Sequence, residues 1–148
     1  MNLYRVSFFG HRVITDIIET ERKIEQIARE LIRTKEFVEF QVGRNGDFDI
    51  VVASAIKRAQ KALGKQNSAL ILVLPYTVKD TEYYEKFYDE IVLPVPPKTH
   101  FKRAITRRNE WMVENSDLVV AYVERKSGGA YSAFAYAEKL KISMIKLK

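Results

Sequence analysis

The sequence predicts an α/β protein with a three-layer, Rossmann-like fold and a mainly parallel, twisted sheet. Three observations support this fold class. Short β-type runs alternate with helical patterns along the whole chain, which is typical of βαβ units. The run 69–74 is continuously apolar, as expected for a strand that is covered on both faces. The 148 residues, 47% of them hydrophobic, suit one compact domain spanning 1–148.

The strands are expected where β-type residues run for a few positions and then meet a glycine, a proline or a charged residue. Gly43 and Pro75 each follow such a run directly. Pro94, Pro96 and Pro97 force an irregular connection after the fourth run. The predicted strands are 3–9, 37–42, 68–74, 91–93, 118–123 and 143–147.

The helices are expected where apolar residues recur with the helical period. In the first helix this stripe consists of Ile17, Ile24, Ile27, Ala28 and Leu31. Either Thr15 or Asp16 is expected to cap that helix, and Gly64 to end the second one. The predicted helices are 16–33, one that follows Asp47 and ends at residue 63, a short one within 76–89, 101–115 and 130–141.

The composition excludes several kinds of site. There are no cysteines, which removes disulfides, thiolate nucleophiles and cysteine-based metal centres. His11 and His100 are the only imidazoles, so a dedicated transition-metal site is not expected. No resident cofactor is predicted either, although a nucleotide-type ligand is possible. No apolar run is long enough to cross a bilayer, and the N-terminal pattern is unlike a signal peptide. We therefore expect a cytoplasmic protein with no membrane partner.

The charge balance favours anionic partners. Lysine and arginine total 25 against 19 aspartates and glutamates, a net charge of +6. Such an excess suits nucleotides, nucleic acid or an anionic surface, although composition alone favours a merely solvated surface. In parallel sheets ligands bind beyond the carboxyl ends of the strands. The segments expected there are 10–15, 43–49, 75–80 and 124–131.

The first of these segments contains Gly10, His11 and Arg12. Gly10 allows a sharp turn at the strand end, and the two side chains after it present donors above the sheet. An ordinary turn with exposed polar residues is the alternative. The segment is not a dinucleotide-binding fingerprint, because the chain has no G-x-G-x-x-G pattern.

The second segment could form a nest of backbone amides that binds phosphate ahead of a helix. An Asn-Gly turn is the alternative reading, and either Asp47 or Asp49 is expected to cap the helix. The residues predicted to bind ligand here are Gly43, Arg44, Asn45, Gly46 and Asp47.

The last of these segments, 124–131, lies between a buried strand and a helix. Its paired glycines, Gly128 and Gly129, allow close approach of the backbone to a ligand, and the helix dipole favours an anion there. Ser127 and Ser132 add hydroxyl donors. A βα loop with a glycine hinge is the alternative.

Two features outside these loops also bear on function. Arg108 falls on the same helical face as Ile105 and Met112, so it requires an anion or a water-filled pocket, and an internal salt bridge or a side chain that reaches out to solvent is the alternative. The tyrosines between residues 76 and 88 are expected to pack a surface helix onto the sheet, and stacking on a base is the alternative.

Taken together these segments resemble the SLOG superfamily of Rossmann-like proteins, which includes DprA-like proteins and cytokinin-activating phosphoribohydrolases. The resemblance is strongest to small bacterial YpsA-like members. It spans most of the chain and rests on the order and spacing of four motifs. They are FGHR at 9–12, GRNGDFD at 43–49, RRNEWM at 107–112 with Ser116-Asp117, and SGGAYSAFAYAE at 127–138.

The phosphoribohydrolase branch has an Arg-x-x-x-Met helix followed by Ser/Ala-Asp, a strand and PGGxGTxxE. Arg108, Met112 and Asp117 match the first part, and Gly128-Gly129 match the paired glycines. The later positions depart from the pattern. Tyr131 stands in place of the third glycine, Ser132 in place of threonine and Ala135 in place of the catalytic glutamate.

The leading hypothesis is therefore a sensor-like domain that binds a nucleotide or nucleotide derivative, with its phosphates on the glycine-containing loops. A nucleotide-processing hydrolase, using Glu138, Asp47 or Asp49 as acid or base, is the second hypothesis, and no catalytic residue is assigned. DprA-like nucleic-acid binding is the third. A homodimer is a further expectation.

Overall fold

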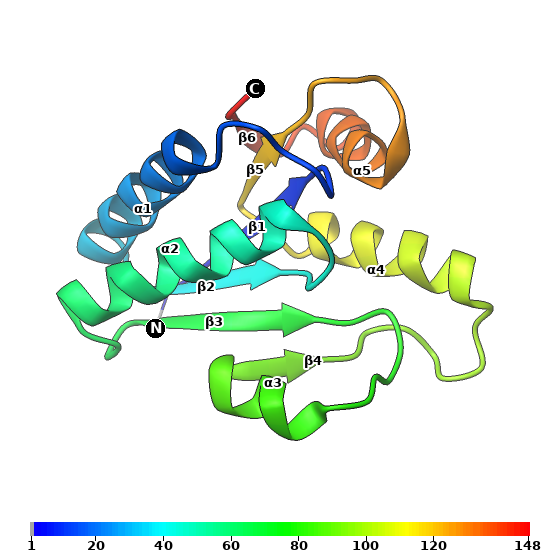
Figure 1. Ribbon diagram of the computed structural model, residues 1–148, viewed down its shortest axis with the longest axis horizontal. Coiled ribbons are helices and arrows are strands. Elements are labelled where there is room, and N and C mark those ends of the chain that lie inside the picture. The colour runs from blue at the N-terminus through cyan, green and yellow to red at the C-terminus, as the bar shows by residue number, and fades with distance from the viewer. Residues whose placement is uncertain (1) are drawn as a thin grey trace.

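The structure, a computed structural model that describes residues 2–148, contains one six-stranded, all-parallel sheet with helices on both faces (Figure 1). The strands are β1 (Leu3–Gly10), β2 (Phe37–Val42), β3 (Ser68–Val73), β4 (Glu90–Val92), β5 (Leu118–Tyr122) and β6 (Ser143–Lys146). The helices are α1 (Ile17–Thr34), α2 (Asp47–Leu63), α3 (Thr81–Phe87), α4 (Phe101–Glu114) and α5 (Gly128–Lys139). The predicted three-layer α/β class is confirmed.

Side chains alternate between the two faces of the sheet, and each face has its own apolar core. On one face Phe8 packs with Ile24 of α1 and Ile56 of α2, all of them almost fully buried. On the other face Phe9 packs with Met112 of α4 and with α5. The continuous apolar pattern of the central strands follows from this double coverage.

The strand order β4-β3-β2-β1-β5-β6 places β1 at the centre (Figure 1). From β1 the chain builds outward through β2 and β3 to β4, and then returns to add β5 and β6 on the opposite side of β1. The connections after β1 and β5 therefore leave toward opposite faces of the sheet. Such a reversal opens a crevice at the carboxyl ends of the two strands, where ligands bind in folds of this kind.

The starts of three helices differ in detail from the sequence prediction. Asp16 occupies the N-cap position of α1, but its side chain does not cap the helix, because it accepts a hydrogen bond from Tyr122 Oη instead. Gly46, with φ of 102°, is the N-cap of α2, so neither Asp47 nor Asp49 caps that helix as predicted. The last helix begins at Gly128, two residues earlier than predicted.

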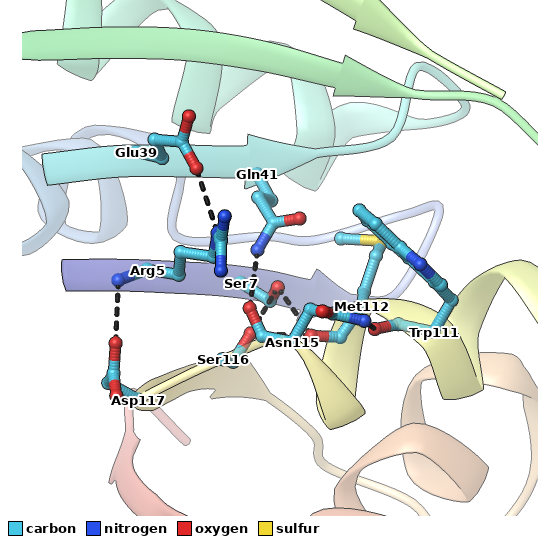
Figure 2. A network of polar contacts seen from close by, with 9 residues as sticks. All are labelled: Arg5, Ser7, Glu39, Gln41, Trp111, Met112, Asn115, Ser116 and Asp117. Carbon is cyan, nitrogen blue, oxygen red and sulfur yellow. Dashed lines mark hydrogen bonds and ion pairs between the residues drawn. The ribbon is translucent and has the colours of Figure 1, made fainter. Parts of the chain in front are cut away.

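A buried polar network fixes the C-terminal end of α4 to the sheet (Figure 2). Gln41 Nε2 on β2 donates to the Asn115 carbonyl oxygen at 3.0 Å. Ser7 Oγ on β1 donates to the Met112 carbonyl oxygen at 3.2 Å and lies 2.6 Å from Ser116 Oγ. These contacts satisfy carbonyl groups that the end of a helix leaves free. They also fix the position of the preceding turns of α4, which face the carboxyl edge of the sheet.

Candidate functional site: a cleft at the carboxyl edge of the sheet

A cleft of about 340 Å³ lies at the carboxyl ends of β1, β2 and β3, between these strand ends, α4 and the start of α5. It lies where the reversal of strand order predicts a ligand site. Four arginines line it, from three of the four predicted loops and from α4, and Asp49 is the one carboxylate among its lining residues. These arginines are Arg12, Arg44, Arg108 and Arg125.

Arg108 projects from α4 into this cleft. Its Nη1 donates to the Val73 carbonyl oxygen at the end of β3, at 3.0 Å. Its Nε is buried and has no hydrogen-bond partner, and within the described part of the chain no carboxylate forms an ion pair with it. Burial lowers the pKa of Arg108, but a guanidinium keeps its proton in proteins. Arg108 is therefore a cation of the cleft with an N–H group that has no hydrogen-bond partner.

Asp49 lies in the first turn of α2, close to the same guanidinium. Its Oδ2 accepts a hydrogen bond from the Asn45 amide at 3.0 Å. Burial raises the pKa of Asp49 to about 7, and the positive charge of Arg108 opposes that rise. The carboxyl group therefore changes charge near neutral pH, and in its protonated form it leaves the cleft more positive.

Gly43 separates these two side chains. A Cβ atom at this position would lie 2.7 Å from Arg108 Nη1, closer than real Cβ atoms approach such a neighbour, and 3.0 Å from Asp49 Oδ2, which is also a tight contact. Gly46 meets a similar limit, since its Cβ would lie 2.6 Å from Arg12 Cα. The glycines of the second loop thus make room for arginines from elsewhere in the chain.

The first two loops are also bonded to each other. The Asp47 amide donates to the Arg12 carbonyl oxygen at 2.7 Å, and the Ile14 amide donates to Asp47 Oδ2 at 3.3 Å. The first contact uses a backbone donor, the Asp47 amide, that the predicted phosphate nest would need, and the first turn of α2 contains two acidic side chains. The start of α2 is therefore poorly suited to a second anion.

The start of α5 has the opposite character. Its first turn contains no acidic residue, its N-cap Ser127 makes no side-chain capping bond, and Gly128, Gly129 and Ala130 line the cleft. The first amides of a helix lack intrahelical partners and attract anions. Nothing lies within 4 Å of where a Gly128 Cβ would be, so a ligand has open access to this turn.

His11 lines the cleft, but not as the donor that was predicted. It is buried, and its Nε2 accepts a hydrogen bond from the Glu124 amide at 2.9 Å. Burial lowers the pKa of His11, with Arg125 adding to the effect, which favours the neutral ring. His11 therefore joins the loop after β1 to the loop after β5.

Gly10 was predicted to allow a turn, but it belongs to β1. A Cβ atom at Gly10 would lie 2.2 Å from the Phe48 ring.

The structure gathers most of the predicted site residues in the cleft. Those that line it are Gly10, His11, Arg12, Gly43, Arg44, Asn45, Arg108, Gly128 and Gly129. Four predicted residues, Gly46, Asp47, Ser127 and Ser132, are not among the lining residues. Ser132 lines a separate depression beside Thr106 and Tyr136, since it lies more than one turn beyond the start of α5.

Four polar lining residues were not predicted to bind ligand: Asp49, Tyr76, Asn109 and Arg125. Asn109 Oδ1 is buried without a hydrogen-bond partner and is thus a second unused polar atom here. Its position next to Arg108 was the only sequence signal for it. Arg125 and Tyr76 lie within the segments 124–131 and 75–80 that were expected at the carboxyl edge of the sheet, although neither side chain was singled out as a ligand-binding residue.

The acids that a hydrolase would require are mostly elsewhere. Glu138 is exposed near the end of α5, and neither Glu138 nor Asp47 is among the cleft's lining residues. Between residues 2 and 148 there is no group of three or more histidine, cysteine or acidic side chains that could hold a metal ion. None of the described helices combines the length and hydropathy needed to span a membrane.

Comparison with known proteins gives a fold relationship. No family model matches the chain, and no curated protein matches its sequence. Among solved structures it is similar to DNA processing protein A from Helicobacter pylori, which was described for its single-stranded DNA binding mode. The two chains are 17% identical, with a TM-score of 0.65 over 97% of this chain and 64% of the other. This chain thus has the fold found in a single-stranded DNA binding protein and spans less than two thirds of that protein's length.

Proposed function

We propose that the chain binds single-stranded DNA through a nucleotide phosphate seated in the cleft. The observation that carries the proposal is that Arg108, a guanidinium that no carboxylate pairs with in the described residues, lines the same cleft as the acid-free start of α5. An unsatisfied buried donor costs about 1–3 kcal/mol. A phosphate in the cleft would compensate the buried positive charge of this guanidinium and at the same time occupy the positive end of the helix.

Single-stranded DNA is the favoured ligand class because the similar protein from Helicobacter pylori binds it. The net charge of +6 and the four arginines of the cleft suit a polyanion. The same likeness supports membership of the SLOG superfamily as part of this proposal. The particular relation to YpsA-like members, the cytoplasmic location and the homodimer stay predictions.

A free nucleotide, or a derivative of one, is the second candidate. The observation that favours it is the shape of the site, a concave cleft of about 340 Å³. That volume lies near the lower end of the range, about 300–1,000 Å³, in which small-molecule pockets enclose their ligands. A chain that bound only such ligands would act as a sensor rather than as a DNA-binding protein.

The test compares two neighbouring arginines of α4. Arg108→Gln removes the cation in the cleft, whereas Arg107→Gln removes a cation that already pairs with Glu110 and Glu114 outside it. We expect Arg108→Gln to weaken binding of a thymidine oligonucleotide about tenfold or more, since a charge-assisted hydrogen bond contributes about 1.5–3 kcal/mol. Arg107→Gln should change it by less than about twofold.

Fluorescence anisotropy with labelled oligonucleotide, and calorimetry with thymidine monophosphate, provide the measurements. Circular dichroism checks that both variants are folded. Equal losses in the two variants, or no binding of either probe by the wild-type protein, would refute the proposal. Binding of the mononucleotide as tight as that of the oligonucleotide would instead establish the second candidate.

A further inference from the structure

A second surface with features of nucleic-acid recognition lies beside the cleft, between α2 and α3. Here a groove of about 450 Å³, the α2–α3 groove, is lined by Ile50, Lys57 and Lys61 of α2 and by Tyr83 and Phe87 of α3, with Tyr88 just after that helix. None of the predicted site residues lines it. In Figure 1, α3 lies next to β4 at the edge of the sheet.

Four aromatic rings form a connected platform on α3. Tyr83 contacts Tyr84 edge to face at 5.4 Å between ring centroids, Tyr84 contacts Tyr88 at 6.2 Å, and Tyr88 contacts Phe87 at 5.0 Å. Phe87 and Tyr88 pack against the hydrophobic core, so Tyr88 is the one tyrosine of the segment shown to attach the helix to the sheet as predicted. Tyr83, at the outer end, is 65% exposed. A ring that is held by its neighbours yet open to solvent is suited to stacking.

Cations stand among these rings. Lys57 Nζ lies 5.0 Å from the centroid of the Phe87 ring. Lys61 is exposed, one turn further along α2, and no ion pair to it occurs among residues 2–148. Arg58 also lines the groove, but its charge is already paired with Glu21 and Glu25. Two lysines therefore remain available to phosphate groups.

Arg44 connects this surface with the cleft. It lines the cleft, and its guanidinium lies 5.9 Å from the centroid of the Tyr84 ring. The α3 acids Glu82 and Glu85 are exposed but do not line the groove. The negative charge of Asp89 acts on Lys57, but the Asp89 carboxylate accepts hydrogen bonds from Lys65, Gln60 and the Leu70 amide. The arrangement of cations and rings thus continues from the cleft into the groove.

We propose that the α2–α3 groove is a second contact surface for the strand bound in the cleft, stacking a base on Tyr83 and holding a phosphate between Lys57 and Lys61. This inference rests on the proposed function, since it extends the same ligand beyond the first phosphate. Alternation of aromatic rings with cations is the pattern that binds single strands without sequence preference. An acidic amphipathic peptide is the other occupant that an apolar groove with basic residues would accept, and it forms one arm of the test.

The experiment measures thymidine monophosphate and a thymidine oligonucleotide of about twelve nucleotides on the same variants. Tyr83→Ala and Lys61→Gln change exposed residues of the groove, and Phe101→Ala and Lys102→Gln are matched controls. Phe101 is 55% exposed on α4, and neither control residue lines the cleft or the groove. We expect Tyr83→Ala to weaken oligonucleotide binding about fivefold or more and Lys61→Gln about threefold, with mononucleotide binding unchanged.

The outcomes separate the two proposals. Wild-type oligonucleotide affinity in both groove variants, alongside its loss in Arg108→Gln, would overturn the groove and leave the cleft standing. Absence of wild-type binding to either probe would overturn the proposed function itself. Binding of a glutamate- and leucine-rich peptide that is lost in Tyr83→Ala, with oligonucleotide binding unaffected, would identify the groove as a peptide site and refute the inference.

Discussion

Arg108, Asp49 and Gly43 form the smallest functional unit of the protein. The two charged side chains lie on either side of a glycine whose own Cβ would contact both. The backbone at Gly43 does not adopt a positive φ, so side-chain space, and not backbone freedom, explains why glycine stands there. Gly10 is similar, since the Phe48 ring occupies the space where its Cβ would be.

Asp49 should make anion binding depend on pH. Its pKa, raised by burial to about 7, means that the carboxyl group gains a negative charge beside the proposed phosphate site as pH rises from 6 to 8. We expect the wild-type affinity for sulfate to fall about tenfold over that range. In Asp49→Asn it should change by less than about twofold, and calorimetry at the two pH values provides the measurement. An equal fall in the variant would show that another group is responsible.

The same group affects stability with a definite sign. Asp49 has a higher pKa in the folded state, about 7, than in the unfolded chain, about 3.9. Between these values the folded state binds more protons, so its contribution to the free energy of unfolding decreases as pH rises toward 7 and is constant above it. Asp49→Asn is expected to lack this decrease, which urea unfolding at several pH values would detect.

At the scale of elements, two helices begin close to the cleft, but they differ in what their first turns offer an anion. The first turn of α2 contains Asp47 and Asp49, while that of α5 contains no acid. The glycine-rich sequence before α2 predicts a phosphate nest there. The contacts of Asp47 with Ile14 and of Asp49 with Asn45 satisfy donors of that region from within the chain. The start of α5 is therefore the better anion site.

The position of α4 depends on the buried network of Figure 2, and this dependence is testable. Gln41 is 1% exposed, and its amide donates to the Asn115 carbonyl oxygen. Gln41→Met removes that donor and leaves a part-buried carbonyl without this partner, so we expect a loss of about 1–3 kcal/mol in the free energy of unfolding. Thr34→Ala removes an exposed, local hydrogen bond on α1 and should cost less than about 0.5 kcal/mol.

Urea denaturation of both variants measures the difference. An effect of Gln41→Met no larger than that of Thr34→Ala would mean that water replaces the lost contact without cost. A network that fixes α4 also fixes Arg108, two turns before its end, so oligonucleotide affinity is expected to fall together with stability.

At the scale of the whole molecule, the net charge of +6 is spread over the surface, with many cations already paired. Arg22, Arg29, Arg58 and Arg107 all form ion pairs with glutamates. We therefore expect a modest salt dependence of oligonucleotide binding. With about two phosphates contacted, the slope of log K against log salt should be about −1.4.

Anisotropy titrations over about 50–500 mM sodium chloride measure that slope. A slope close to zero would mean that no phosphate is contacted. A slope steeper than about −5 would mean that a broad basic surface, rather than the cleft and the α2–α3 groove, dominates binding.

The sequence by itself determined the fold class and nearly every element, because the alternation of apolar runs with helical stripes is a local property of the chain. It also indicated Arg108, because a cation on an apolar helical face is costly unless an anion or water surrounds it. The tertiary structure decided the strand order, and with it which loops meet. It also decided the roles of Asp49, His11 and Gly43, because contacts between residues far apart in the sequence set their burial, hydrogen bonds and available space.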